Sequence, residues 1–273
     1  QDVVRAEQTE DIAEVLSTMP KWNNNGRAML PLKENWSQQL DELKDFYKNS
    51  GYGMFAKFVA FTWRNEAFVP ITAIDPITLG DLKNYELQRQ KVVDNTTAFI
   101  NGLPANNVLL YGDRGTGKSS TVHAILNEYK SKGLRMIEIS KGDINDLTMI
   151  REKIADSPMK FIIFIDDLSF DNHDDSFGEL KAALEGSLSG RQNNTLIYAT
   201  SNRRHLIKEN FSDRENDVNR SETHQEELSL TDRFGLSVTF INPDKAQFFD
   251  IVEKIALDSG LKADIPKLLA AAD

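Results

Sequence analysis

Apolar residues recur along this chain in two patterns, and the two patterns predict strands that alternate with helices. Unbroken apolar runs, typical of strands buried on both faces of a parallel sheet, begin at Val108 and cover Leu134–Ile139, Phe161–Asp167, Thr195–Asn202 and the end of Leu228–Ile241. Apolar residues three and four positions apart predict helices within 122–129, 143–155, 177–188 and 248–255. Strands and helices that alternate in this way imply right-handed crossovers and an open parallel sheet.

Residues 1–70 have a different pattern and are expected to form a helical region. After Ser37, which can cap a helix, apolar residues recur on one helical face: Leu40, Leu43, Phe46 and Tyr47. The aromatic run Met54–Trp63 is expected to be buried. The region is either a partner-binding or regulatory module or a set of helices packed on the next domain. We favour packing, because apolar helical faces are usually part of a core.

Prolines, glycines and charged residues mark the expected boundaries. Two prolines make Pro70–Thr78 an extended linker, and residues 71–242 form the expected α/β domain. Within it, 208–227 holds seven acids and three bases, so we expect a solvated loop, with a functional contact as the alternative. Asn242 and Pro243 are suitable cap and first-turn residues for a helical lid over 243–273, which we expect to be incomplete.

The composition fits a globular protein without a general basic surface. Among 273 residues, 42 acids against 32 bases give a formal net charge of −10, which offers no general attraction for nucleic acid or anionic lipid. The sequence has no cysteine, which suits a reducing cytoplasm. Apolar runs such as Phe161–Ile165 are too short to span a membrane, and the polar residues after Gln1 do not resemble a secretory signal. We therefore expect a cytoplasmic protein without a membrane partner.

The stretch Val108–Ser120, VLLYGDRGTGKSS, joins an apolar strand to a helix through a glycine-rich turn that matches G-x-x-x-x-G-K-[ST]. The glycines allow successive main-chain N–H groups to surround a phosphate, and the helix adds its positive N-terminal end. Lys118 is expected to reach the β- and γ-phosphates, and the Ser119 hydroxyl to hold Mg²⁺. The expected nucleotide-binding residues of this turn are Gly112, Asp113, Arg114, Gly115, Thr116, Gly117, Lys118, Ser119 and Ser120.

Two neighbouring acids end the run Phe161–Asp167. Asp166 is expected to hold Mg²⁺ through its water shell, with capping of a following helix as the alternative. A full strand and helix lie between the phosphate loop and Asp166, which favours nucleotide hydrolases over small-molecule kinases. Asp167 stands where those hydrolases usually have a glutamate to orient water; because aspartate is shorter, either the site is compact or hydrolysis is slow. Three nearby acids are alternatives, although solvated loop acids are the simpler interpretation: Asp171, Asp174 and Asp175.

Further polar residues follow in the order that such a site requires. Asn202 is expected to hydrogen-bond the γ-phosphate or the attacking water, although a polar residue at a strand end is commonplace. Arg233 is expected to reach the γ-phosphate of a neighbouring subunit as an arginine finger, with surface pairing to Asp232 as the alternative. Arg203 and Arg204 are further candidates for that role. The four histidines lack metal-ligand spacing and are interpreted as structural or surface groups: His123, His173, His205 and His224.

The motifs GDRGTGKS, FIIFIDD, ATSN and DRFGL, in this order, resemble the AAA+ ATPases. Longer stretches, NNVLLYGDRGTGKSS, IDDLSF, ATSNRRHL and LSLTDRFGLSVTF, resemble a bacterial family of that class, the domain of unknown function 815, over Asp75–Ala256. The resemblance implies a three-layer αβα P-loop NTPase with strand order 5-1-4-3-2, a small helical lid after Ile241, and assembly as a ring or arc. It also implies that Leu82 and Tyr85 lie over the adenine of ATP.

The leading hypothesis is an ATPase that uses ATP and Mg²⁺ to remodel an unknown protein client as a homo-oligomer. The alternative is an ATP-gated switch or assembly module with negligible hydrolysis, which is favoured by Asp167 and by the lack of any arginine after Arg233, since AAA+ lids usually carry a second sensor arginine. A DNA-associated ATPase, similar to replication initiators or helicase loaders, would need a basic surface stripe, which the net charge of −10 does not support.

Overall fold

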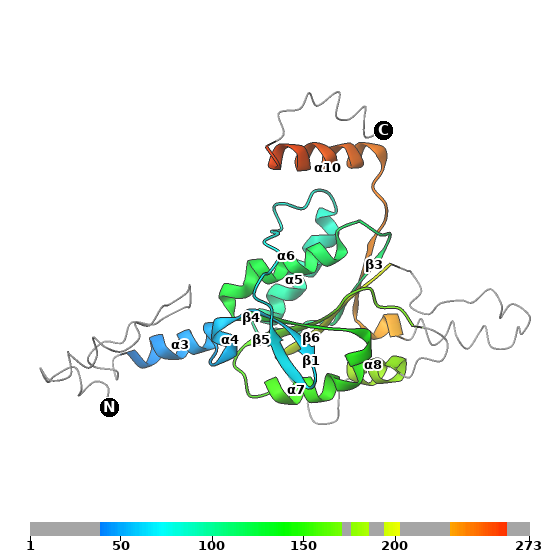
Figure 1. The fold of residues 1–273 in the computed structure, drawn as a ribbon. Coiled ribbons are helices and arrows are strands. Elements are labelled where there is room, and N and C mark those ends of the chain that lie inside the picture. Colours follow the sequence, from blue (N-terminus) through cyan, green and yellow to red (C-terminus); the bar gives the residue numbers. More distant parts are fainter. Residues whose placement is uncertain (1–38, 171–175, 186–193, 203–229, 261–273) are drawn as a thin grey trace, which may run out of the picture.

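A seven-stranded sheet with helices on both faces forms the centre of the computed structural model, which describes residues 39–170, 176–185, 194–202 and 230–260 (Figure 1). The strands are β1 (Ala60–Arg64), β2 (Ala67–Pro70), β3 (Val108–Gly112), β4 (Leu134–Ile139), β5 (Lys160–Ile165), β6 (Thr195–Ser201) and β7 (Leu236–Phe240). The helices are α3 (Leu40–Ser50), α4 (Met54–Lys57), α5 (Glu86–Ile100), α6 (Lys118–Tyr129), α7 (Leu147–Ile154), α8 (Ser176–Glu185) and α10 (Lys245–Asp258), with 3-10 turns η2 (Lys130–Lys132) and η3 (Lys141–Asp146).

The strand order is β2-β1-β4-β5-β6-β3-β7. Counted from the phosphate-loop strand β3, the five strands from β7 to β4 follow the expected order 5-1-4-3-2, and all of their pairings are parallel. The three-layer α/β fold predicted from the sequence is therefore confirmed. Two additional strands, β1 and β2, extend this sheet beyond β4.

The prediction that residues 1–70 are helical is wrong for β1 and β2. Strand β1 pairs in parallel with β4 and antiparallel with β2, across a turn in which Asn65 and Glu66 have positive φ. Phe61 and Trp63 alternate along β1 and are buried, at 0% and 2% exposure. Large aromatic side chains two residues apart pack well on one face of a pleated sheet. The strand part of the aromatic run is therefore buried as expected, whereas Met54 at its start is 42% exposed.

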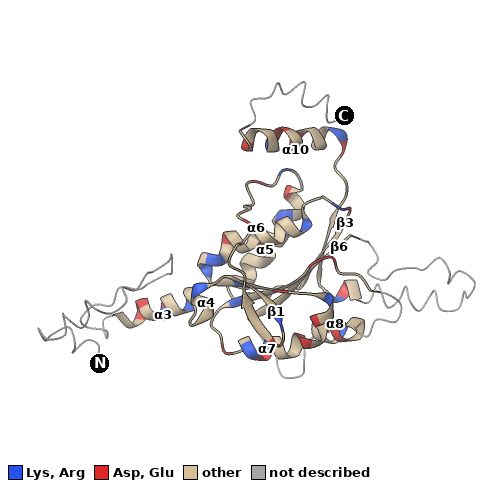
Figure 2. Cartoon of the chain, in the orientation of Figure 1, with Lys and Arg blue, Asp and Glu red and all other residues tan. Residues whose placement is uncertain are grey.

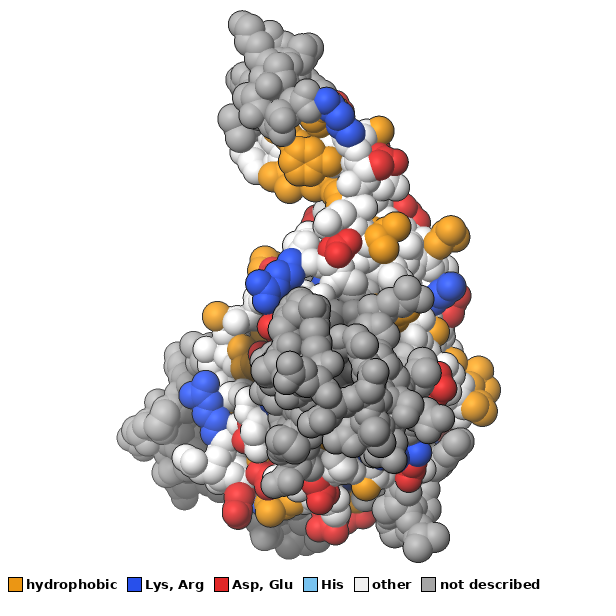
Figure 3. Space-filling model, turned by 90° about the vertical axis from the view of Figure 1, so that its right-hand side faces the viewer, with side chains coloured by type: hydrophobic (Ala, Val, Ile, Leu, Met, Phe, Trp, Pro, Cys, Tyr) orange, Lys and Arg blue, Asp and Glu red, His pale blue; other side chains and the backbone are white. Residues whose placement is uncertain are grey.

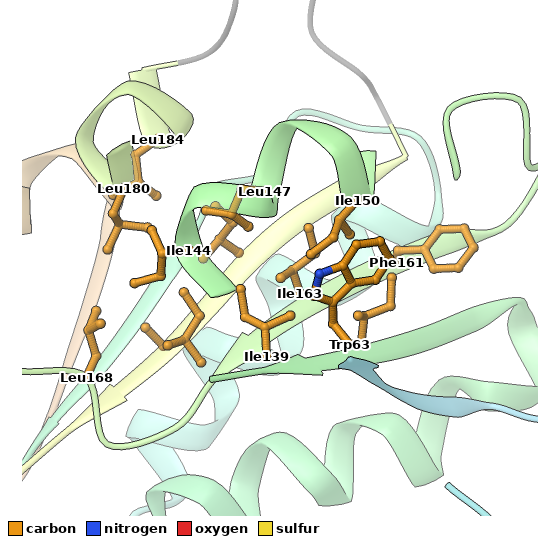
Figure 4. Close-up of a cluster of buried hydrophobic side chains, with 14 of the residues drawn as sticks. Trp63, Ile139, Ile144, Leu147, Ile150, Phe161, Ile163, Leu168, Leu180 and Leu184 are labelled. Atoms are coloured by element: carbon orange, nitrogen blue, oxygen red, sulfur yellow. The ribbon is translucent and has the colours of Figure 1, made fainter. Parts of the chain in front are cut away.

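Two hydrophobic clusters hold the layers together, one on each face of the sheet. Helices α5 and α6 cover one face, where Val92, Ile125 and Phe164 pack together. On the other face, η3, α7 and α8 cover a cluster that extends from Leu180 and Leu184 to Trp63 and Phe161 (Figure 4). Charged residues lie mainly on the outer helices, with both signs interspersed, while the central strands are largely uncharged (Figure 2). The described residues contain no helix long and apolar enough to cross a membrane.

The first and last described helices are attached more loosely. Helix α3 is confirmed, yet its predicted apolar face is not fully packed, since Leu40 and Tyr47 are 63% and 46% exposed; Ser37 lies outside the described residues. Helix α10 is capped by Asp244 instead of Asn242, because the side chains of Asp244 and Gln247 form a reciprocal capping box.

Helix α10 stands away from the sheet and is joined to it by one connecting segment after β7 (Figure 1). The molecule narrows at this connecting segment (Figure 3). Ala256 is its buried residue, whereas Ile255 and Leu257 are 59% and 60% exposed. Residues 245–258 of the expected lid thus form a helix with few contacts to the domain, and its role as a lid stays a prediction.

Candidate nucleotide site

The phosphate loop lies between β3 and α6, at the edge of the sheet where the parallel strands end. Gly112, Gly115 and Gly117 have φ of 133°, 75° and 82°, which side chains with a Cβ rarely adopt. At Gly112 a Cβ would also lie 1.8 Å from the main-chain oxygen of Phe240 on β7. Positive φ at Gly115 and Gly117, two positions apart, is typical of loops whose successive N–H groups turn toward one anion. The sequence therefore forms the predicted loop.

Lys118, the first residue of α6, is held against this loop. Its ammonium group donates hydrogen bonds to the main-chain oxygens of Gly112, at 3.2 Å, and Asp113, at 2.6 Å. The residue is 6% exposed, and burial lowers the pKa of Lys118, an effect opposed by the charges of Asp113, Asp166 and Asp167. A cation that is largely withdrawn from water and aimed at the loop is suited to a phosphate oxygen.

Ser119 and Asp166, the two predicted Mg²⁺ ligands, are brought together. The Ser119 hydroxyl donates to Oδ1 of Asp166 at 2.6 Å, although the two residues are far apart in sequence. Asp166 follows β5 directly, and Ser119 lies in the first turn of α6. Among the described residues no group of three His, Cys, Asp or Glu is placed to hold a metal, but Mg²⁺ commonly takes one or two protein oxygens together with phosphate and water. The pair fits that requirement.

Asp167 and Asn202 also meet at this edge. The amide nitrogen Nδ2 of Asn202 donates to Oδ1 of Asp167 at 2.6 Å. Asp167 has a φ of 51°, in the left-handed region, which costs roughly 1 kcal/mol for a residue other than glycine. The structure therefore places the two predicted catalytic residues of β5 and β6 side by side.

Sequence reasoning missed Thr200, which lies between these two pairs. The Thr200 hydroxyl donates to Oδ1 of Asp166 and accepts a hydrogen bond from the Asp167 N–H at 2.9 Å. Strand β6 pairs with β5 through Ala199 and Ile165, so the residues after each come into contact. The signal was present: a hydroxyl residue near the end of an apolar strand beside the strand that carries Asp166.

The two residues predicted to lie over adenine flank the loop and the connection to α10. Leu82 lies 4.0 Å from the position of a Cβ at Gly117. The Tyr85 ring packs on Phe240 at 5.2 Å, and its hydroxyl donates to the main-chain oxygen of Ile241 at 2.6 Å. Burial, together with the charge of Asp113, raises the pKa of Tyr85.

The phosphate loop contacts the same connection. The N–H of Asp113 donates to the Phe240 oxygen at 2.8 Å, and its carboxylate accepts from the N–H of Asn242 at 2.6 Å. Asn84 donates to the main-chain oxygen of Gln247, in the first turn of α10, at 2.9 Å. These contacts, with that of Tyr85, link the loop and the start of α5 to the segment that carries α10.

Arg233 lies apart from these residues. It precedes β7, whose first residue pairs with Val108, so it is at the opposite edge of the sheet from the phosphate loop of its own chain. Its guanidinium pairs with Glu185 at the end of α8 instead of the alternative, Asp232. This position does not bring it to its own site, and a role at a neighbouring site stays a prediction.

The remaining candidates are His123 and residues that the structure does not describe. His123 packs edge-on against Phe164, in keeping with a structural role. The charged stretch 208–227 and several candidate residues lie outside the described residues: Asp171, Asp174, Asp175, Arg203, Arg204, His173, His205 and His224.

A family model described as "Protein of unknown function (DUF815)" matches residues 56–273. The Replication factor C large subunit of Nanoarchaeum equitans is 30% identical over 82 residues, which are 30% of this chain and 18% of that protein. The same subunit from Sulfurisphaera tokodaii is 27% identical over 116 residues, 40% of this chain and 26% of that protein. The matches thus span no more than about a quarter of these curated relatives.

Among solved structures, two RuvB variants of Thermotoga maritima align with 71% of this chain and with 57% and 58% of their own. Their sequence identities are 16% and 17%, and the TM-scores are 0.49 and 0.47. The strand order, the phosphate loop and the family match together make this chain a P-loop NTPase of the AAA+ type.

Proposed function

This chain belongs to the DUF815 family, and from that premise we propose that it binds ATP with Mg²⁺ and hydrolyses it to ADP and phosphate. The observation that supports the proposal is the continuous set of contacts at one sheet edge: Lys118 against the phosphate loop, Ser119 on Asp166, and Asn202 on Asp167. These groups lie on α6 and at the ends of β5 and β6. They are suited to the three tasks of phosphoryl transfer: binding phosphate, binding Mg²⁺ and orienting the attacking water.

The proposed roles follow from the contacts. Lys118 moves its ammonium group from the loop carbonyls to the phosphate oxygens, while the loop N–H groups surround the β-phosphate. Ser119 and Asp166 hold Mg²⁺, which when bound neutralises phosphate charge and orients the γ-phosphate. Asp167 accepts a proton from the attacking water, and Asn202 holds that carboxylate in place.

We further propose that subunits assemble so that Arg233 meets the neighbouring site, and that hydrolysis drives the remodelling of a protein client. The support is the position of Arg233 at the sheet edge opposite its own phosphate loop. The proposal also places the protein in the cytoplasm, because the sequence has no cysteine.

A second candidate function is an ATP-gated switch that hydrolyses negligibly. It is favoured by the short side chain of Asp167, whose carboxylate is already engaged by Asn202, and by α10, which contacts the domain at few points. In this case ATP would change the position of α10 through the contacts of Asp113 and Tyr85.

The deciding experiment is steady-state phosphate release with ATP and Mg²⁺ over a range of protein concentrations. Lys118→Ala is the blank, and Lys91→Ala, an exposed lysine on α5, is the matched control. The ATPase proposal predicts release that Lys118→Ala abolishes and Lys91→Ala leaves unchanged, with turnover per subunit rising with concentration. Release at the level of the blank, with ATP binding confirmed by calorimetry, would instead support the switch. If Lys118→Ala binds ATP as tightly as the natural chain, both candidates are wrong.

A further inference from the structure

Thr200 is the buried polar residue that touches both acids of the candidate site. It is 2% exposed and lies near the end of β6, between β5 and β3. Its hydroxyl donates to Asp166 and accepts from the Asp167 N–H, and its main-chain oxygen accepts from the Leu168 N–H at 2.7 Å. One residue therefore holds three successive residues after β5.

We propose that Thr200 is a positioning residue that sets the Mg²⁺-binding and water-orienting acids in one geometry; this inference rests on the proposed function. A hydroxyl has one hydrogen to donate and lone pairs to accept. Because Thr200 donates its hydrogen to Asp166, its oxygen is available to the N–H of Asp167. The bond to the Asp166 carboxylate is charge-assisted and therefore among the stronger kinds.

The backbone conformation of Asp167 shows why these hydrogen bonds of Thr200 are needed. Its φ of 51° is unfavourable for aspartate, so the turn after β5 must be held by its surroundings. The contacts of Thr200 with the N–H groups of Asp167 and Leu168 supply that restraint from β6. The same turn directs the Asp167 carboxylate to Asn202 and leaves Asp166 facing Ser119.

Partners that orient metal-binding side chains typically contribute about 10- to 100-fold to metal affinity. Thr200→Val keeps the shape of the side chain but removes the hydroxyl, whereas Thr200→Ser keeps the hydroxyl. We expect Thr200→Val to need about 10- to 100-fold more Mg²⁺ to reach half-maximal enhancement of ATP binding. Without Mg²⁺ its affinity should stay within about twofold of the natural chain, and Thr200→Ser should restore the Mg²⁺ requirement.

The test is the binding of a fluorescent N-methylanthraniloyl derivative of ATP, measured in EDTA and then over a Mg²⁺ titration. Thr96→Val is the matched control, because Thr96 is also buried and its hydroxyl bonds Tyr198 and the main chain of α5, away from the site. Phosphate release and thermal unfolding are recorded for each variant. Thr200→Val should also lower turnover, while Thr96→Val should change stability without changing the Mg²⁺ requirement.

An unchanged Mg²⁺ requirement in Thr200→Val would overturn the inference and leave the proposed function standing. A loss of affinity that is equal with and without Mg²⁺ would assign Thr200 a structural role and would also overturn it. If the natural chain binds the probe with Mg²⁺ but releases no phosphate, hydrolysis fails while the Mg²⁺ titration still decides the role of Thr200. If the natural chain does not bind the probe, the proposed function and the inference are both wrong.

Discussion

The two edges of the parallel sheet use polar groups in different ways. At the edge where the strands end, side chains bond other side chains: Ser119 and Thr200 both donate to Asp166. Near the edge where they begin, Arg135 on β4 is 3% exposed and donates to the main-chain oxygens of Phe55, Lys130, Leu134 and Ser50. The first arrangement orients groups for chemistry, and the second attaches chain segments to the domain.

This difference predicts that substitutions at the two edges will have different effects, one on nucleotide binding and the other on stability. At the first edge Asp166 and Asp167 are exposed and Ser119 is half-buried, so these three side chains can change partner when a ligand binds. Burial lowers the pKa of Arg135 to about 10, so it stays charged near neutral pH, and its donors are satisfied by fixed backbone oxygens. Substitutions at the first edge should affect nucleotide binding most, and those at the second should affect stability most.

Gly112→Ala should give the largest effect. Gly112 lies at the nucleotide edge, yet we expect its substitution to reduce stability, unlike other substitutions at that edge. Its Cβ would meet the Phe240 oxygen at 1.8 Å, so β3 and β7 would have to separate. We expect a loss of more than about 4 kcal/mol in the free energy of unfolding, measured by urea denaturation.

Gly115→Ala is the matched control for this clash. Its φ of 75° is also positive, but a Cβ there would have no neighbour within 4 Å. It should cost only about 1 kcal/mol in stability, from backbone strain. Equal losses in the two variants would show that φ, and not the contact with β7, explains the glycine at position 112.

Arg233→Ala tests whether the edge where the strands begin also serves catalysis in a neighbouring subunit. An arginine finger contributes about 10³-fold or more to turnover, which equals about 4 kcal/mol. The loss should appear in phosphate release, while ATP affinity stays within about twofold.

Glu185→Ala is the control, because it removes the same ion pair but leaves the guanidinium. It should keep turnover near that of the natural chain, and both variants should lose less than about 1 kcal/mol of stability, since the pair is partly exposed. Similar turnover in the two variants would assign Arg233 to the surface pair alone.

Arg135→Met tests the structural edge directly. The substitution keeps an unbranched side chain but leaves buried main-chain oxygens without their donor, each of which costs about 1 to 3 kcal/mol. After partial relaxation, we expect a loss of about 3 kcal/mol in the free energy of unfolding and unchanged ATP affinity. Arg64→Met, at the exposed end of β1, is the control and should change stability by less than about 0.5 kcal/mol. A loss of ATP affinity in Arg135→Met at full stability would contradict the separation of the two edges.

The sequence predicted the five-strand core and several residues that lie together at the candidate site, because local patterns mark both. Apolar runs mark the strands buried on both faces, and the glycine spacing marks the phosphate loop. The extension by β1 and β2 was missed, since the run Met54–Trp63 satisfies a buried helix and a buried strand equally well. Pairing with β4, 70 or more residues away in sequence, decided between them.

The hydrogen-bond and ion-pair partners of side chains were less predictable than the helices and strands. The role of Thr200 depends on β6 lying beside β5, which a sequence shows only after the strand order is known. The pairing of Arg233 with Glu185 depends in the same way on α8 lying near the start of β7. For α10, the sequence suggested Asn242 as the N-cap, but the N-cap is Asp244, because its reciprocal hydrogen bonds with Gln247 satisfy two N–H groups at once.

Tyr85→Phe, at the connection between the nucleotide edge and α10, should give the smallest effect. It removes the hydrogen bond to the Ile241 oxygen but keeps the ring on Phe240, so we expect a loss of about 1 kcal/mol in stability. Because burial raises the pKa of Tyr85 above its usual value of 10.0, the folded protein resists ionisation of this hydroxyl. The advantage of tyrosine over phenylalanine is therefore complete below pH 10 and is lost as the pH rises through the folded-state pKa. Tyr52→Phe, at a side chain that is 52% exposed, is the control. Equal stability losses in the two variants, or a difference that does not shrink at high pH, would mean that the Tyr85 hydroxyl does not hold this connection.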